Sequence, residues 1–177
     1  MKKVLVISGS PRKGGNSDLL CDEFIKGALK AGHQVEKIWL GDKTINFCRA
    51  CYYCYEKHEC FQKDDMGEIL EKMISSDVIV MATPVYFYSI SGQMKTLIDR
   101  TLPRWQNFDD KEFYFIITSA EDDKSIQKRT LECLRGFTDC LNNPVEKGVL
   151  YATGVYKKGE VKNKTYMNEA FQMGLKA

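Results

Sequence analysis

The sequence predicts an α/β protein with a doubly wound parallel sheet. Apolar runs typical of strands and apolar stripes typical of helices alternate five times along the chain. Three of the runs, VLVI, VIVMA and FYFII, are almost continuous, which is typical of strands that are covered on both faces. The length of 177 residues suits one ordinary domain, so we expect a single domain over residues 1–177.

Each expected element follows from a local pattern. The strands are expected at residues 4–8, 35–40, 78–82, 113–118 and 149–153. The helices, where apolar residues recur three or four positions apart, are expected at residues 20–28, 66–74, 94–102, 126–141 and 164–175. Asn16 and Ser17 can cap the first helix, and Asp65 with Glu68 has the spacing of a capping box before the second.

Composition and charge exclude several classes of protein. The 26 Lys and Arg residues nearly balance 24 Asp and Glu residues, so neither a basic nucleic-acid arm nor an acidic tail is present. The apolar stretch after Lys2-Lys3 has only four residues, too few for a signal peptide or a membrane span. We therefore expect a cytoplasmic protein, without nucleic-acid or membrane partners, whose seven cysteines are thiols or metal ligands rather than disulfides.

A loop rich in Gly and Ser, at residues 8–17, joins the first strand to the first helix. Ligands of open α/β sheets bind at this edge, and a helix N-terminus there favours an anion. The loop lacks the closing Gly-Lys-Ser/Thr of a Walker A motif and the G-x-G-x-x-G of a dinucleotide site. It suits one terminal phosphate bound by Ser10, Arg12, Asn16 and Ser17; the alternative is a flexible turn before a capped helix.

The segment 41–64 interrupts the alternation of strands and helices. It has no helical period, and its aromatic residues argue against disorder, so we expect a functional loop. Its four cysteines follow the pattern C-x2-C-x2-C-x5-C, which is enough to ligate one cluster or one metal. They are Cys48, Cys51, Cys54 and Cys60. Structural zinc and free thiols remain open alternatives, whereas Cys21, Cys133 and Cys140 are expected to be buried thiols on helices.

Four motifs together resemble the flavodoxin-like NAD(P)H-dependent FMN reductases. They are GSPRKGGNS after the first strand, the cysteine loop running into KDDM, TPVYF at residues 83–87, and SGQMKTLIDRT at residues 91–101. The compact four-cysteine loop resembles that of the iron–sulfur flavoproteins, which carry a 4Fe–4S cluster near the flavin. The resemblance implies strand order 2-1-3-4-5, bound FMN, and a homodimer or higher oligomer.

The same resemblance implies which residues contact the flavin. Pro84, Val85, Tyr86 and Phe87 would lie along the ring, whereas Tyr88 is equally well explained as a core or interface aromatic. Ser119 and Ala120 would contribute backbone amides, although relatives often carry glycines where this chain has Ala120-Glu121. No residue is expected to act as a catalytic acid or base, because the flavin carries the hydride chemistry.

The implied function is electron transfer from NAD(P)H, bound transiently, to a small acceptor such as a flavin or quinone by a ping-pong scheme. The alternative is an electron carrier that takes single electrons from a ferredoxin-like donor. The aromatic residues of segment 41–64 and of residues 86–88 are expected to pack on a second subunit and to wall the flavin site.

Overall fold

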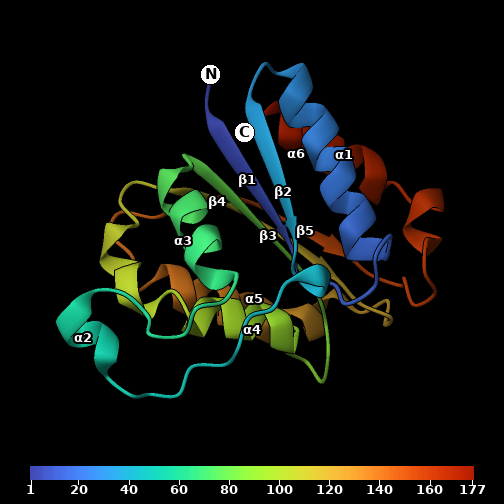
Figure 1. The fold of residues 1–177 in the computed structure, drawn as a ribbon. Coiled ribbons are helices and arrows are strands. Elements are labelled where there is room, and N and C mark those ends of the chain that lie inside the picture. The colour runs from blue at the N-terminus through green and yellow to red at the C-terminus, as the bar shows by residue number, and fades with distance from the viewer.

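The computed structural model describes residues 1–177 and contains one five-stranded parallel sheet (Figure 1). The strand order is β2-β1-β3-β4-β5, which confirms the predicted order. The strands are β1 (Lys3–Ser8), β2 (Gln34–Trp39), β3 (Val78–Pro84), β4 (Glu112–Thr118) and β5 (Val145–Ala152). β5 begins four residues earlier than its apolar run, because an edge strand can extend through exposed polar residues.

Helices cover both faces of the sheet, as the continuous apolar runs predicted (Figure 1). One face carries α1 (Asn16–Lys30) and α6 (Tyr166–Leu175), and the other carries α3 (Met66–Ser75), α4 (Gly92–Asp99) and α5 (Lys128–Thr138). Alternate residues of each strand enter the two cores: Val4 and Val6 pack toward α1, and Leu5 and Ile7 pack toward α3 and α4.

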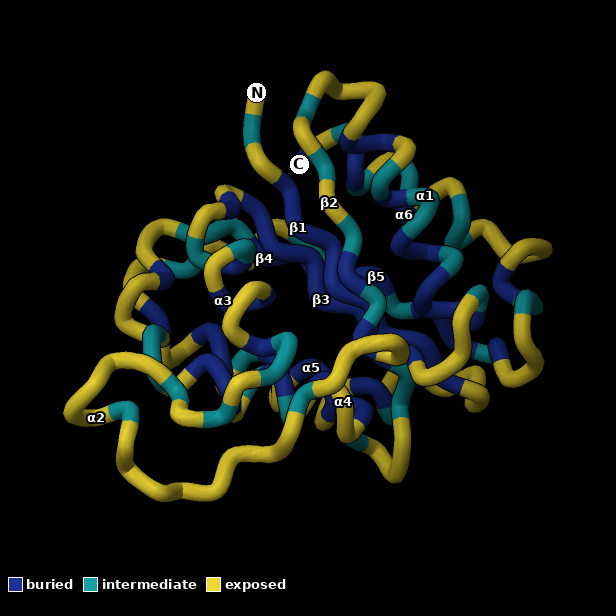
Figure 2. The backbone as a smooth tube through the Cα atoms, in the orientation of Figure 1, coloured by how far each residue is buried: buried dark blue, intermediate teal, exposed yellow.

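Short helices fill the connections between these elements. They are α2 (Tyr53–Lys57) and the 3-10 helices η1 (Leu40–Asp42), η2 (Leu102–Asn107), η3 (Lys124–Gln127) and η4 (Glu160–Asn163). α2 projects from the body of the molecule, and Figure 2 shows most of the chain around it as exposed. None of the helices is both long and apolar enough to span a bilayer.

α1 and α6 pack with their backbones in direct contact. A Cβ atom added to Gly27 would lie 2.1 Å from the carbonyl oxygen of Phe171, and one added to Gly174 would lie 2.0 Å from that of Phe24. Only glycine permits such an approach at either position.

Two of the expected helix caps are not formed. α1 begins at Asn16, with Gly15 as its N-cap, and no side chain caps it. The prediction of a capping box formed by Asp65 and Glu68 was wrong, because the Asp65 carboxylate accepts instead from the Thr44 N–H at 2.6 Å. The neighbouring Asp64 accepts from the Met66 N–H at 3.2 Å, so a side chain one position earlier serves the start of α3.

Candidate flavin site and cysteine loop

The loops that follow β1, β3 and β4 meet at the carboxyl edge of the sheet. The Gly9 N–H donates to the Ala82 carbonyl at 2.7 Å, and the Val85 N–H donates to the Thr118 carbonyl at 2.8 Å. Ligands of open α/β sheets bind at this edge. The three loops that the sequence singled out therefore form one surface.

The loop between β1 and α1 is a compact turn suited to an anion. The Arg12 N–H donates to Ser10 Oγ at 3.2 Å, and the Gly15 N–H donates to the Arg12 carbonyl at 2.9 Å. Gly14 has a left-handed φ of 66°, which few other residues adopt without strain. The first N–H groups of α1 have no acceptor within the helix, and they lie at the positive end of its dipole.

A partly buried ion pair supports this loop. The Asp18 carboxylate accepts from the Gly14 N–H at 2.8 Å and lies 2.7 Å from Lys37 Nζ. Burial alone would raise the pKa of Asp18, but the hydrogen bonds from Lys37 and Gly14 outweigh it and lower the pKa. The carboxylate is therefore ionised at neutral pH, and Lys37 neutralises a charge that would otherwise repel a phosphate.

The side chains of Asn16 and Ser17 are engaged within the protein. The Asn16 amide donates to the carbonyls of Val155 and Lys157, at 3.1 and 3.0 Å, and its oxygen accepts from the Gly159 and Val161 N–H groups. The Ser17 hydroxyl lies 2.7 Å from the buried hydroxyl of Thr118. All polar atoms of the Asn16 side chain thus brace the C-terminal segment in this structure, and phosphate binding by Asn16 and Ser17 stays a prediction.

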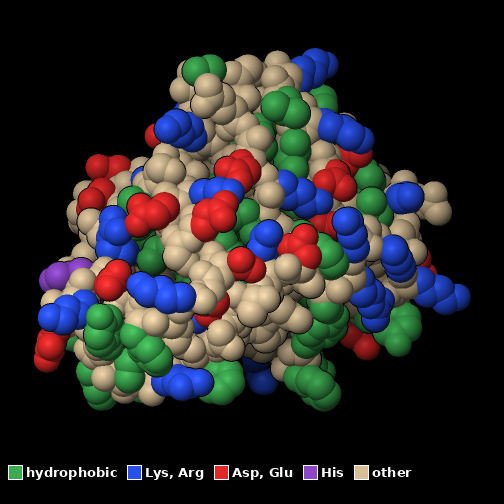
Figure 3. Space-filling model, in the orientation of Figure 1, with side chains coloured by type: hydrophobic (Ala, Val, Ile, Leu, Met, Phe, Trp, Pro, Cys, Tyr) green, Lys and Arg blue, Asp and Glu red, His purple; other side chains and the backbone are tan.

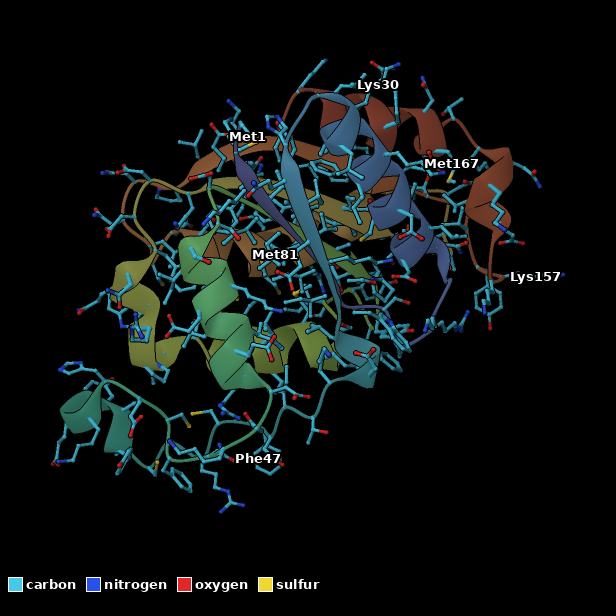
Figure 4. The ribbon with its side chains drawn as sticks, turned by 45° about the horizontal axis from the view of Figure 1, so that its top comes forward. Met1, Lys30, Phe47, Met81, Lys157 and Met167 are labelled. Carbon is cyan, nitrogen blue, oxygen red and sulfur yellow. The ribbon has the colours of Figure 1, made fainter.

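Sequence reasoning missed this C-terminal segment, residues 155–161. The Arg12 guanidinium donates to the Tyr156 carbonyl at 3.3 Å, and a Cβ on Gly14 would lie 3.4 Å from the Lys158 side chain. Figure 4 labels Lys157 on this segment, far from Phe47 on the cysteine loop. The segment thus brings the side chain of Lys158 to the phosphate loop, and the only signal in the sequence was the adjacent pair Lys157-Lys158.

The chain after β3 makes a tight turn that presents aromatic side chains to solvent. Tyr86 and Ser89 exchange backbone hydrogen bonds of 2.9 and 3.0 Å. Phe87 and Tyr88 between them both have left-handed backbones, with φ of 49° and 62°, and Phe87 is fully exposed. Asn and Gly usually occupy such a turn, so two aromatics there store strain of the kind that gathers at functional sites. Flavin contact by Pro84–Phe87 stays a prediction.

The loop after β4 leaves fewer free groups than expected. The Ser119 N–H donates to the Ala152 carbonyl at 2.9 Å, and its hydroxyl accepts from Gln127 Nε2 at 2.6 Å. The Ser119 amide thus has a backbone partner in β5, and flavin contact by Ser119 stays a prediction. Ala120 is exposed at the same edge and stays a candidate.

The cysteine loop is closed at a neck of paired residues. Thr44 pairs with Asp65, the Asn46 N–H donates to the Asp64 carboxylate at 3.0 Å, and Gln62 Nε2 donates to the Phe47 carbonyl at 3.2 Å. These contacts connect residues 44–47 to residues 62–65, so the chain between them forms a closed loop.

A buried guanidinium lies at this neck. Arg100, the C-cap residue of α4, places NH1 2.7 Å from one Asp64 oxygen and NH2 3.0 Å from the other. The two side chains are only 2% and 3% exposed. Burial alone would raise the pKa of Asp64, but Arg100 and the N–H groups of Asn46 and Met66 together outweigh it and lower the pKa, so the pair is ionised.

All four loop cysteines line one cavity of about 110 Å³, together with Arg100. Burial raises the pKa of Cys54, and the other three cysteines are close enough to raise it further. The side chains are not gathered into a finished metal site, because no three His, Cys, Asp or Glu residues are positioned around one ion. The donor set suits a cluster or a zinc ion, with a positive charge beside it.

A second cavity, about 1250 Å³, lies between the cysteine loop, the end of α4 with η2, and α5. Cys133 on α5 and Cys140 in the turn after α5 line it and are exposed, so the expectation that they are buried was wrong, whereas Cys21 is buried as expected. Figure 3 shows hydrophobic side chains at the lower left, where Figure 1 places α2.

The fold and the arrangement of loops define a class of protein. The family model for NADPH-dependent FMN reductases matches residues 2–136, and the chain belongs to this family. This finding confirms the resemblance and the flavodoxin-like fold.

Individual relatives point in the same direction. An iron–sulfur flavoprotein of Archaeoglobus fulgidus is 44% identical over 101 residues, which are 57% of this chain and 46% of that protein. The chain thus spans about half the length of the curated relatives it matches.

Two solved structures share the fold. The NAD(P)H:quinone oxidoreductase from Methanothermobacter marburgensis has a TM-score of 0.78 at 14% identity, covering 98% of this chain and 94% of that one. The FMN-dependent NADH-azoreductase from Bacillus anthracis, in complex with FMN, has a TM-score of 0.73 at 17% identity, covering 99% of both chains.

Proposed function

We propose that this protein binds FMN at the carboxyl edge of the sheet and passes electrons from NAD(P)H to a small acceptor such as a flavin or quinone. The phosphate loop, which runs directly into the N-terminus of α1 beside an exposed aromatic turn, is the observation that carries the proposal. The nicotinamide nucleotide and the acceptor would use the same exposed face in turn, a ping-pong scheme.

FMN, when bound, supplies the hydride chemistry, and the protein supplies position and charge. Ser10, Arg12 and the first N–H groups of α1 would hold the phosphate. Ser10 Oγ accepts from the Arg12 N–H and one Arg12 nitrogen donates to Tyr156, which leaves the other guanidinium donors and the N–H groups of the helix N-terminus for the anion. The turn at Phe87 would flank the ring. No acid or base is required of the protein for this role.

The phosphate assignment can be tested with Arg12→Met. Charge-assisted hydrogen bonds contribute about 1.5–3 kcal/mol, so FMN affinity should fall roughly 10- to 150-fold. Lys30→Met removes one positive charge at the far end of α1 and should leave the affinity unchanged. Fluorescence titration of FMN-free protein measures both, and equal affinities for Arg12→Met and wild type would contradict the assignment.

A second function is favoured by the cysteine loop, whose four thiols line a single cavity. We propose a 4Fe–4S cluster held by Cys48, Cys51, Cys54 and Cys60 as the alternative to a plain reductase. The protein would then act as an electron carrier that accepts single electrons from a ferredoxin-like donor. The relatives named as iron–sulfur flavoproteins support this candidate.

Iron, acid-labile sulfide and FMN per subunit, measured on protein prepared without oxygen, separate the two candidates. Cys51→Ser should lose the iron and keep the FMN, because the phosphate loop is elsewhere in the molecule. Cys133→Ser changes an exposed cysteine outside the loop and should keep both. Wild-type protein with full FMN and no iron would reject the cluster and leave the reductase.

A further inference from the structure

We propose that Arg100 is the positioning residue of the cysteine loop. It holds the two ends of the loop together, and it donates its Nε–H to the cluster that the four cysteines would ligate in the cavity. The first half concerns the fold of the loop alone. The second half rests on the iron–sulfur candidate proposed above.

One guanidinium contacts both ends of the loop. Its NH1 donates to the Asn46 carbonyl at 2.5 Å, and NH1 and NH2 together bind the Asp64 carboxylate. Residue 46 enters the loop and residue 64 leaves it, so Arg100 joins positions 18 residues apart. A lysine has one nitrogen and no planar fork, and it cannot make these contacts at once.

The remaining donor of this side chain has no partner. Arg100 Nε is buried and makes no hydrogen bond, although buried donors in proteins are nearly always paired. Arg100 lines the same cavity as all four cysteines. A cluster ligated by four thiolates carries sulfur acceptors and negative charge, which would satisfy the orphaned donor.

A contribution to the stability of the fold does not by itself explain why Arg100 and Asp64 are buried as an ion pair. A buried ion pair often stabilises a fold no more than apolar residues of the same volume would. The ion pair here differs from an apolar contact because it fixes a carbonyl and a carboxylate on opposite sides of one loop. Hydrogen bonds to cluster sulfurs also raise the reduction potential, an effect that a purely structural residue would not have.

The test uses three variants of the ion pair. Two are Arg100→Lys and Arg100→Met, and the third carries both Asp64→Asn and Arg100→Gln, so that it leaves no uncompensated charge. Arg104→Met is the matched control, because it removes an arginine whose ion pair with Glu71 is exposed. Each protein is prepared without oxygen, and FMN per subunit reports whether it has folded. Iron per subunit and the midpoint potential of the cluster are the readouts.

We expect every Arg100 variant to keep its FMN, to bind less iron, and to show a lower midpoint potential in whatever cluster remains. Arg104→Met should match wild type in all three. Wild-type iron content and potential in both Arg100→Lys and the double variant would overturn the role of the Nε–H. Iron-free wild-type protein would overturn that role together with the iron–sulfur candidate.

Limited proteolysis of metal-free protein tests the first half separately. Opening of the neck should expose residues 47–63, so Arg100→Lys and the double variant should be cut there at least about fivefold faster than wild type. Arg104→Met should be cut at the wild-type rate. Equal rates in all four proteins would overturn the positioning role, whatever the cavity holds.

Discussion

The Asp64 carboxylate accepts hydrogen bonds from three separate parts of the chain: Asn46, Met66 and Arg100. It thereby ties the end of the cysteine loop to the start of α3 and the end of α4. Removing the charge from one side of a buried pair typically costs about 3–5 kcal/mol, because the other charge is left without a partner.

Asp64 should make the protein sensitive to acid. Its folded-state pKa lies below the ordinary value, so its contribution to stability is present at neutral pH and is lost as the pH falls below about 4. Asp64→Asn should lower the free energy of unfolding at pH 7 by about 3–5 kcal/mol. Between pH 7 and pH 3 the variant should lose less of its free energy of unfolding than wild type does. Urea unfolding at the two pH values measures this.

Glu71→Gln, which breaks an exposed ion pair with Arg104, is the control and should behave as wild type does. If Asp64→Asn lost as much stability between pH 7 and pH 3 as wild type, Asp64 would not be the acid-sensitive group.

At the residue scale, the sequence located the phosphate loop correctly but did not show which contacts its side chains make. The placement of Ser10 and Arg12 at the carboxyl edge of the sheet could be predicted, because they follow an apolar strand directly in a Gly-rich loop. The bracing contacts of Asn16 could not be predicted, because its partners lie 139–145 residues further along the chain. The buried partner of Arg100 was equally hidden, since nothing local to residue 64 or residue 100 links the two.

At the scale of elements, the contact between α1 and α6 depends on two glycines that face each other's backbone. Gly27→Ala would normally favour a helix by up to about 1 kcal/mol. Here the new Cβ would lie 2.1 Å from a carbonyl oxygen, so the helices must separate, and the variant should instead lose about 1–3 kcal/mol of stability.

Gly136→Ala in α5 provides the matched control, because nothing lies within 4 Å of its new Cβ. It should unfold at a slightly higher urea concentration than wild type, whereas Gly27→Ala should unfold at a lower one. Two variants that shift the midpoint in the same direction would contradict the packing argument.

Periodicity predicted where the helices lie, but not how they cross. The stripe of Leu20, Phe24 and Ala28 correctly identified the buried face of α1. The close approach of α6 could not be predicted in this way, because it depends on Gly174, which lies on a helix that contacts α1 only in the folded chain. α2 was missed because its five residues are too few to show a period.

At the scale of the whole molecule, exposed aromatics predict assembly. Phe47, Tyr52 and Tyr55 on the cysteine loop are 74%, 70% and 65% exposed, and Phe87 is fully exposed. We expect these residues to pack on a second copy of the chain, since isolated subunits rarely leave so much aromatic surface in water.

Phe47→Ser with Tyr55→Ser should therefore shift a dimer toward monomer. Light scattering coupled to size-exclusion chromatography at micromolar concentration measures the change. Leu29→Ser removes another exposed apolar side chain, on α1, and should leave the mass unchanged. Monomeric wild-type protein with FMN bound would contradict the expectation.

The contacts of Asn16 also set an order of events during synthesis. The phosphate loop is made well before residues 155–161, which brace it. At roughly 5–20 residues per second, the nascent loop waits about 7–30 s for that support. Capture of FMN is therefore expected only after residues 155–161 have been made, and messages truncated before residue 155 should yield chains that have the phosphate-loop sequence but cannot retain the flavin.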